Sequence, residues 1–362
     1  MTNREKQIYM IIKEDPLISQ EELADKLGLT RSSVAVHISN LMKKGYIIGK
    51  GYITQEPTYI TVLGAANIDI GGSPNGVLLS HDSNPGTIRT SHGGVGRNIA
   101  HNLSLLGNSV KFITALGDDE YGHKIIETMN RLAVDVHESL ITRENQTSIY
   151  LYINDGAGDM NVAINDMAIY EKITPAFLQS KLETLRHSAA VVLDANLSED
   201  AINYVVDNVN VPFFADPVSC VKAVKFKKLL PKLELITPNA LEAEVLSDRK
   251  IDKYDDASIK AAADEILARG AKNVIITLGA RGAYLANKNM HMILPVVSAK
   301  SVNTTGAGDA LLSGVVTGFV NGFSAEDSLR LGQAAAAITT ESLETNNPLL
   351  TFTAVKKRAE LA

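Results

Sequence analysis

The sequence predicts an α/β protein in which helices flank a mostly parallel sheet that carries a small β lid, with a separate helical domain in front. From Tyr59 onward, strand-like runs alternate with helical patterns, which is typical of parallel α/β folds. Several of these runs, such as AVVLD at 190–194, are continuously apolar, as expected for strands covered on both faces. We therefore expect one domain at 1–55 and a second at 58–362.

Residues 1–55 predict three short helices followed by a hairpin. Ser19 starts the second helix with Glu22 as its capping-box partner, and Thr30 caps the third. This order is typical of a winged helix-turn-helix domain, whose third helix enters the major groove of duplex DNA. The candidate DNA contacts are the outward residues of that helix and a lysine in the hairpin turn: Arg31, Ser32, Val36, Ser39, Lys43 and Lys50. The alternative is a small interaction or dimerisation domain.

Composition and charge exclude some classes of protein. The net charge of −6 divides into +2 over 1–55 and −8 over the remainder, which permits a nucleic-acid partner at the N-terminal domain and disfavours one elsewhere. No apolar run reaches the roughly 20 residues that span a bilayer, and no signal peptide precedes the first helix. Cys220 stands alone, so no internal disulfide forms. We expect a cytoplasmic protein without a membrane partner.

One segment interrupts the alternation of strands and helices. Residues 147–167 predict two strands joined by a polar, glycine-rich turn, and residues 86–92 supply a further strand. Together they predict a small sheet that stands off the main one as a lid, from about 71–92 and 146–168.

The strongest chemical motif is NTTGAGDALLSGVVTGFV, at 303–320. A helical pattern follows Asp309, so Gly306-Ala307-Gly308 lies at a helix N-terminus, where free N–H groups bind a phosphoryl group. Asp309 is placed to accept a proton from an attacking hydroxyl. The letters GAGD also occur at 156–159, but no helix follows there, which predicts a surface turn. The P-loop motif is absent from the sequence.

Two weaker motifs supply hydrogen-bonding groups for a hydroxylated ligand. The paired glycine in GGVGRN includes Gly94 and leads into a helix that carries Asn98. Asn67 and Asp69 alternate with apolar residues and so point to one face of a strand. Taken alone, GGVGRN is weak evidence against a tight turn with a capping asparagine, and for Asn67 and Asp69 a turn is the more typical role.

The order of these motifs resembles the PfkB family of carbohydrate and nucleoside kinases, which have the ribokinase-like fold. The resemblance covers residues 59–345 and rests on GAANID, GGVGRN, TPNALE, TLGARG and TTGAGD. Residues 83–107, with ADPVS at 215–219, are most similar to the pseudouridine kinases of that family.

The resemblance implies a role for each matching residue. Asp309 would be the catalytic base, and the N–H groups of Gly306, Ala307 and Gly308 would form an anion hole. Ribose hydroxyls would be bound by Asn67, Asp69, Gly94 and Asn98. The ATP and Mg²⁺ site would be formed by Asn239, Glu242 (through water to Mg²⁺), Thr277, Gly279 and Gly282. Asp166 would contact the base or ribose, or is a strand-end turn residue. Asn303 replaces the family's usual aspartate, which leaves activation by a monovalent cation such as K⁺ in question.

The implied activity is that of a phosphotransferase with an alcohol acceptor. We expect ATP-dependent phosphorylation of a nucleoside 5′-hydroxyl, with pseudouridine as the substrate and a homodimer as the working form. The alternatives are a kinase for another nucleoside such as inosine, a kinase for a free sugar, and a transcription regulator that senses a ligand through a kinase fold.

Overall fold

The computed structural model of the protein describes residues 1–49, 58–155 and 159–361. The chain divides into two compact units, Met1–Thr58 and Tyr59–Ala362. Across the described ranges, none of the helices combines the length and the apolar character that crossing a bilayer requires.

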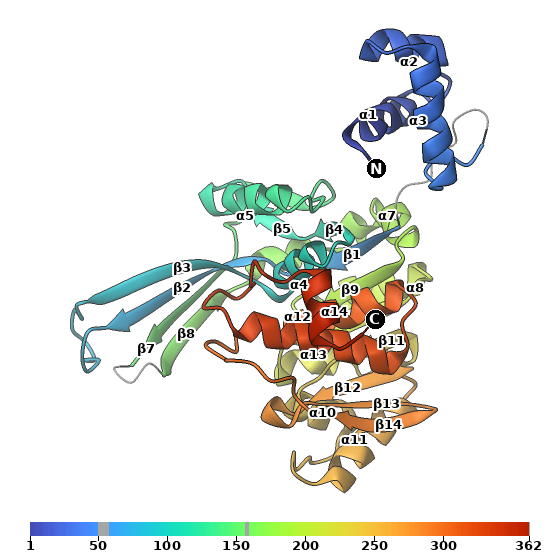
Figure 1. Ribbon diagram of the computed structural model, residues 1–362. Helices are drawn as coiled ribbons and strands as arrows, with labels where there is room; N and C mark the ends of the chain where they lie inside the picture. The colour runs from blue at the N-terminus through green and yellow to red at the C-terminus, as the bar shows by residue number, and fades with distance from the viewer. Residues whose placement is uncertain (50–57, 156–158, 362) are drawn as a thin grey trace. The chain divides into compact units, whose positions relative to one another are not determined.

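The first unit contains the three predicted helices (Figure 1): α1 (Asn3–Glu14), α2 (Gln20–Leu27) and α3 (Arg31–Lys43). The Ser19 hydroxyl accepts from the Glu22 N–H while the Glu22 carboxylate accepts from the Ser19 N–H, so the predicted capping box is confirmed. Thr30 caps α3 as predicted. The core is formed by aliphatic side chains from all three helices: Ile8, Ile12, Leu23, Val34, Ile38 and Leu41. The turn of the predicted hairpin, including Lys50, lies outside the described residues.

The second unit is built on an eight-stranded sheet in the order β14-β13-β12-β11-β10-β9-β1-β4. Its strands are β1 (Tyr59–Leu63), β4 (Ser109–Ile113), β9 (Ala190–Asp194), β10 (Phe213–Asp216), β11 (Leu233–Ile236), β12 (Asn273–Thr277), β13 (Ala283–Asn287) and β14 (Met290–Leu294). Neighbours from β4 through β12 are parallel, and β13 and β14 add an antiparallel edge. The predicted mostly parallel sheet is confirmed.

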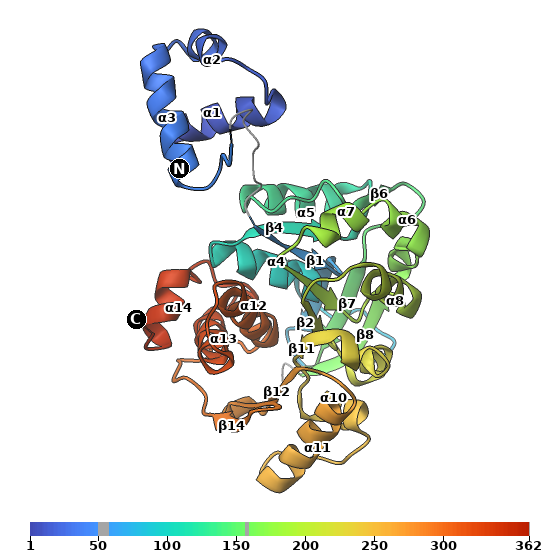
Figure 2. The same cartoon turned by 90° about the vertical axis from the view of Figure 1, so that its right-hand side faces the viewer.

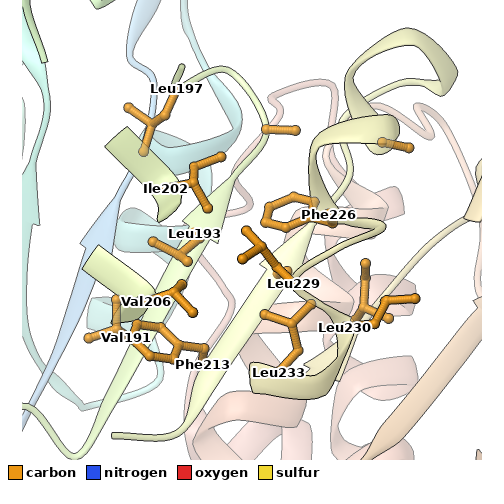
Figure 3. Close-up of a cluster of buried hydrophobic side chains, with 14 of the residues drawn as sticks. Val191, Leu193, Leu197, Ile202, Val206, Phe213, Phe226, Leu229, Leu230 and Leu233 are labelled. Carbon is orange, nitrogen blue, oxygen red and sulfur yellow. The ribbon is translucent and has the colours of Figure 1, made fainter. Parts of the chain in front are cut away.

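Helices cover both faces of this sheet. Alternate residues of β9 face opposite layers: Val191 and Leu193 belong to one apolar cluster, Ala190 and Val192 to another. One layer contains α8 (Glu199–Asn208), α10 (Ala240–Ser247) and α11 (Asp256–Ala268). The other contains α4 (Val95–Leu105), α5 (Glu120–Arg131), α12 (Ala307–Val320) and α13 (Ala325–Thr340). Figure 2 shows α12 and α13 on one side of the strands and α8 on the other. Figure 3 shows the first cluster, which fixes β9 and β10 through Leu193 and Phe213.

A second sheet of four strands has the order β3-β2-β7-β8. Its strands are β2 (Asn67–Pro74), β3 (Gly86–Gly93), β7 (Ile149–Asn154) and β8 (Met160–Asp166). They project away from the main sheet in Figure 1. We call this sheet the lid. The sequence pattern at 59–70 predicts one strand, but the structure divides it, because the chain leaves the main sheet after Leu63 and joins the lid at Asn67.

The remaining elements are short. A two-stranded parallel sheet pairs β5 (Ala115–Gly117) with β6 (Leu140–Thr142). The other α-helices are α6 (Pro175–Gln179), α7 (Leu182–Arg186), α9 (Cys220–Ala223) and α14 (Phe352–Arg358). The 3₁₀-helices are Ala168–Lys172, Val224–Phe226, Leu230–Lys232 and Gly279–Arg281.

Candidate active site

Four carboxyl groups gather where the central parallel strands end. Asp194 ends β9, Asp216 ends β10, Glu242 lies in the first turn of α10 after β11, and Asp309 lies in the first turn of α12. The pKa of Asp216 is raised well above its usual value by burial and by the charges of Asp309 and Glu242. In open α/β sheets the carboxyl ends of the strands form the ligand-binding edge. Asp194 and Asp216 are members of this group that the sequence motifs did not identify as site residues.

The start of α12 has the geometry expected of an anion site. Gly306 precedes the helix with φ of 80°, and a Cβ at this position would lie 2.5 Å from the Thr345 carbonyl oxygen, so only glycine fits. Ala307 donates its N–H to the Thr304 carbonyl at 3.3 Å. As at any helix N-terminus, the N–H groups of the first turn and the positive end of the helix dipole point past Gly306, although the Ala307 N–H is engaged with Thr304.

Asp309 is buried and has a strongly shifted pKa. Its side chain is 8% exposed, and Asn98 Nδ2 donates to its Oδ2 at 2.6 Å. Burial raises the pKa of Asp309 to about 7, with a further increase from Asp194, against the lowering effects of the Asn98 hydrogen bond and the Arg97 charge. A carboxyl group with a pKa near 7 is well matched to accept a proton at neutral pH.

Asn67 and Asp69 lie together at the base of the lid. Asn67 Nδ2 donates to Asp69 Oδ1 at 2.6 Å, and burial raises the pKa of Asp69. A Cβ on Gly93 would lie 2.4 Å from both Asp69 carboxylate oxygens, and Gly94 has φ of 95° with its Cβ position 2.5 Å from the Ala65 carbonyl oxygen. The two glycines thus allow β3 and α4 to approach β2 closely. Asp69 and the Asn98–Asp309 pair are linked through Arg97, whose charge acts on both carboxyl groups.

A cavity of about 1110 Å³ extends from the lid to the loops beside α12. Its walls include residues of β2, β3, β7, α4 and the α12 region: Asp69, Arg89, Ser91, Arg97, Tyr150, Tyr152, Asn303, Thr305 and Asn346. In the lid register Asp69 lies opposite Tyr150 and Ser91, and Gly71 lies opposite Tyr152 and Arg89. A Cβ on Gly71 would lie 2.5 Å from the Tyr152 ring, so this ring packs directly over the glycine. The sequence motifs did not single out the two tyrosines, because their position in a shared cavity depends on the lid register.

Asp166 is a predicted site residue that the structure does not bring to this cavity. It pairs with Ile149, whereas its neighbour Asn165 pairs with Tyr150 in the row that contains Asp69. Successive strand residues point to opposite faces, so Asp166 belongs to the other face of the lid. It is exposed, and its Oδ1 accepts from the Ala168 N–H at 3.3 Å. The strand-end turn role is therefore the one that the structure supports.

The residues predicted to bind nucleotide lie after β11 and β12. Asn239 and Glu242 form a capping box at the start of α10, with reciprocal bonds of 2.9 and 3.0 Å, and burial raises the pKa of Glu242. Thr277 pairs with Asn239 in an isolated bridge, which joins the ends of the two strands. Gly279 and Gly282 have φ of 61° and 97° in the turn after β12.

The candidate DNA contacts lie in the other unit. Arg31, Ser32, Val36, Ser39 and Lys43 are all exposed on α3. Val36, the aliphatic member of this set, is 59% exposed. This face of α3 is therefore open to solvent within the first unit, where the Ser32 hydroxyl also hydrogen-bonds to the N-cap Thr30 hydroxyl at 3.0 Å.

Comparisons with known proteins match both units. Residues 57–351 match the pfkB family carbohydrate kinase, and residues 1–48 match the winged helix-turn-helix DNA-binding family. The uncharacterized sugar kinase YeiI of Escherichia coli strain K12 is 39% identical over 97% of this chain and 97% of its own length. The pseudouridine kinase of the same strain is 36% identical over 85% of this chain and 98% of its own. The solved structure of a carbohydrate kinase from Agrobacterium tumefaciens has a TM-score of 0.74 and 29% identity, covering 84% of this chain and 98% of that one.

Proposed function

The chain belongs to the pfkB family of carbohydrate kinases, and we propose that it transfers the γ-phosphoryl group of ATP to the 5′-hydroxyl of a nucleoside, with pseudouridine preferred. The buried Asp309, in the first turn of α12 and three residues after the N-cap Gly306, is the observation that carries this proposal. The 36% identity to a pseudouridine kinase over nearly its whole length supports the choice of substrate.

The reaction needs a proton acceptor and a site for the transferred charge. Asp309 takes the proton of the 5′-hydroxyl while the hydroxyl oxygen forms a bond to the γ-phosphorus. The bond from that phosphorus to the β,γ-bridging oxygen breaks, and ADP leaves with the electron pair. The N–H groups of Gly306 and Gly308, and that of Ala307 once it exchanges its 3.3 Å bond to the Thr304 carbonyl for the phosphoryl group, stabilise the negative charge on the phosphoryl oxygens.

The acidic group beside the nucleotide residues fits a magnesium ion. Burial raises the pKa of both Asp216 and Glu242, and the charges of Asp309 and Glu242 raise the pKa of Asp216 further, so a cation beside them would favour their ionised forms. Within the described part of the chain no three acidic, histidine or cysteine side chains form a ready-made metal cage. Proteins hold Mg²⁺ through one or two carboxylates, water and substrate phosphates. Glu242, with Asp216 beside it, would hold the ion, which supplies charge neutralisation for the phosphates. Asn239, Thr277, Gly279 and Gly282 would line the nucleotide.

The cavity under the lid favours a nucleoside over a free sugar. Asn67, Asp69, Gly94 and Asn98 would bind the ribose hydroxyls. One row further along the lid, about 7 Å away by strand geometry, the Tyr152 ring and Arg89 offer an aromatic surface and hydrogen-bond donors. An aromatic ring and a guanidinium at this distance from the ribose site suit a planar base, a group that a free pentose lacks.

The hydrogen bonds of the Asn303 side chain indicate whether a monovalent cation is needed beside the anion site. Its Oδ1 accepts from the Thr305 N–H at 3.0 Å, and its Nδ2 donates to the Leu343 carbonyl at 3.1 Å. This neutral amide connects the two loops beside the anion site by itself. We therefore propose that the enzyme needs no K⁺ at this position.

Two features support a dimeric protein that binds DNA. The lid face opposite the cavity carries exposed aliphatic residues, namely Ile88, Leu151, Val162 and Ile164, and we propose that a second copy of the chain covers them. The match of 1–48 to a DNA-binding family and the exposed outer face of α3 support binding of duplex DNA by the first unit.

A substrate panel tests the proposal. ADP release is measured with pseudouridine, uridine, inosine, ribose and fructose, and pseudouridine should give the highest kcat/KM. A higher value for inosine or for a free sugar would redirect the proposal to that substrate. An absence of turnover with all five, with ligand binding retained, would favour the sensing regulator.

A further inference from the structure

Arg97 is a buried cation in an unfavourable position. It is 3% exposed in the first turn of α4, where the positive end of the helix dipole repels a cation. Burial lowers its pKa to about 10, while the charges of Asp309 and Asp69 act in the opposite direction, so it stays protonated at neutral pH. The stability of α4 alone gives no reason for an arginine here.

The guanidinium sets the direction of a short hydrogen-bond chain. Arg97 Nη2 donates to Asn98 Oδ1, and Asn98 Nδ2 donates to Asp309 Oδ2 at 2.6 Å. Arginine has donors only, whereas the two ends of an asparagine amide can exchange places. Because Arg97 can satisfy only the oxygen end of Asn98, the nitrogen end must face Asp309. An N–H that faces a carboxyl group favours the ionised form of that group.

The same guanidinium also holds the loop beside the anion site. Arg97 Nη2 donates to Asn346 Oδ1 at 2.8 Å, and Asn346 Nδ2 donates to Asn102 Oδ1 at 2.8 Å and to the Asn98 carbonyl at 3.1 Å. Asn346 follows Thr345, whose carbonyl oxygen lies against Gly306. Backbone carbonyls of β3 fix the guanidinium itself, with Arg97 donating to His92 at 2.8 Å and to Gly93 at 3.1 Å. A flexible single-point donor such as lysine cannot make this set of planar contacts.

The carboxyl groups around Asp309 disfavour its ionised form, so a nearby positive charge is needed to keep it ionised. Asp194 at the end of β9 faces it and raises its pKa, and Asp216 at the end of β10 interacts with it as well, with Glu242 beyond. Two histidines near Arg97, His92 and His101, have lowered pKa values owing to burial and to Arg97, so they are neutral at pH 7. Lys222 and Lys225 interact with Asp194, and Arg97 is the cation whose charge lowers the pKa of Asp309 itself.

We infer that Arg97 is a positioning residue, which fixes the Asn98 amide so that its N–H faces Asp309 and the carboxyl group stays an ionised proton acceptor. The inference rests on the proposed role of Asp309 as the base. It concerns a residue inside the GGVGRN motif that does not itself react with substrate.

The test is the pH dependence of kcat in Arg97→Met and Arg97→Lys. Wild-type kcat should rise as pH increases through about 7, because only the ionised form of Asp309 accepts the proton. In Arg97→Met the rise should move to higher pH by about 1 pH unit or more, since both the charge and the fixed amide are lost. Arg97→Lys keeps the charge and should show a smaller displacement. The displacement should also shrink in an Asn98→Ala background, because the two residues act in one chain.

Two further measurements separate positioning from a purely structural role. Arg131→Met removes an exposed arginine of α5 that pairs with Glu127, and its pH profile should match the wild type. Carbon-13 NMR of the carboxyl groups, assigned with Asp309→Asn, follows the Asp309 pKa without any substrate. The pKa of Asp309 should rise in Arg97→Met even if none of the panel substrates is phosphorylated. Failure of the proposed kinase function can therefore be distinguished from failure of the proposed role of Arg97. An unchanged Asp309 pKa together with an equal loss of kcat at every pH would assign Arg97 a structural role only.

Discussion

At the scale of single residues, substitution of Asp309 should lower kcat without changing substrate binding. Asp309→Asn keeps the size of the side chain and an oxygen for Asn98, but it cannot take up the proton. Loss of a general base costs on the order of 10²–10⁴ in kcat, whereas KM should change little. ADP release measures both. Asp159 lines the same cavity but is exposed and is followed by a strand rather than a helix, so Asp159→Asn, in the other Gly-Ala-Gly-Asp sequence, is the matched control and should keep near wild-type kcat. Retention of more than half of kcat by Asp309→Asn would exclude it as the base.

The same residue should make stability depend on pH. Burial raises the pKa of Asp309 to about 7, so folding favours its protonated form. Its contribution to stability is present below the pKa of the unfolded chain, about 4, and is lost as pH rises through 7. Asp309→Asn cannot ionise and avoids this loss. The Tm of the variant relative to the wild type should therefore increase between pH 4 and pH 8, as measured by calorimetry. A constant difference would show that Asp309 is ionised without penalty.

At the scale of elements, the sequence predicts those structural features that are determined by residues close together along the chain. The capping boxes, the glycine before α12 and the apolar strands follow from local chemistry, and Asn98 and Asp309 could be placed from their motifs. Asp194 and Asp216 could not, because each simply ends an apolar strand, and only the strand order brings them beside Asp309. The hydrophobic pattern of residues 59–70 does not reveal that the segment divides between two sheets. Asp166 shows the effect of register, since one position along β8 decides which lid face a side chain occupies.

The lid gives a test at this scale through two adjacent glycines of β2. A Cβ on Gly71 would lie 2.5 Å from the Tyr152 ring, whereas the nearest atom to a Cβ on Gly72 is 3.9 Å away. Gly71→Ala must therefore displace the ring from the cavity, and Gly72→Ala need not. We expect Gly71→Ala to raise KM for the nucleoside by about tenfold, equivalent to roughly 1.4 kcal/mol of lost contact. Steady-state kinetics and Tm of both variants check this. Equal effects of the two substitutions would mean that Tyr152 does not contact the base.

At the scale of the whole molecule, the two units should carry separate activities. The matched kinase family begins at residue 57, and the first unit has its own core of aliphatic side chains, so a chain starting at Pro57 should keep wild-type kcat and KM. The full-length protein should bind duplex DNA through α3, and the truncated one should not.

The outer face of α3 offers few cations, chiefly Arg31 and Lys43. The affinity for DNA should therefore fall moderately as the salt concentration rises, and binding should require two domains in a dimer. Gel retardation with DNA upstream of the protein's own gene, at several salt concentrations, measures the affinity for DNA. Sedimentation of the same samples measures dimerisation. Ser39→Glu in α3 adds a negative charge to the exposed face and should abolish retardation while leaving ADP release unchanged. DNA retention by the truncated chain would move the DNA site to the kinase unit, and an absence of salt-dependent binding by the full-length dimer would assign the first unit to docking of another protein.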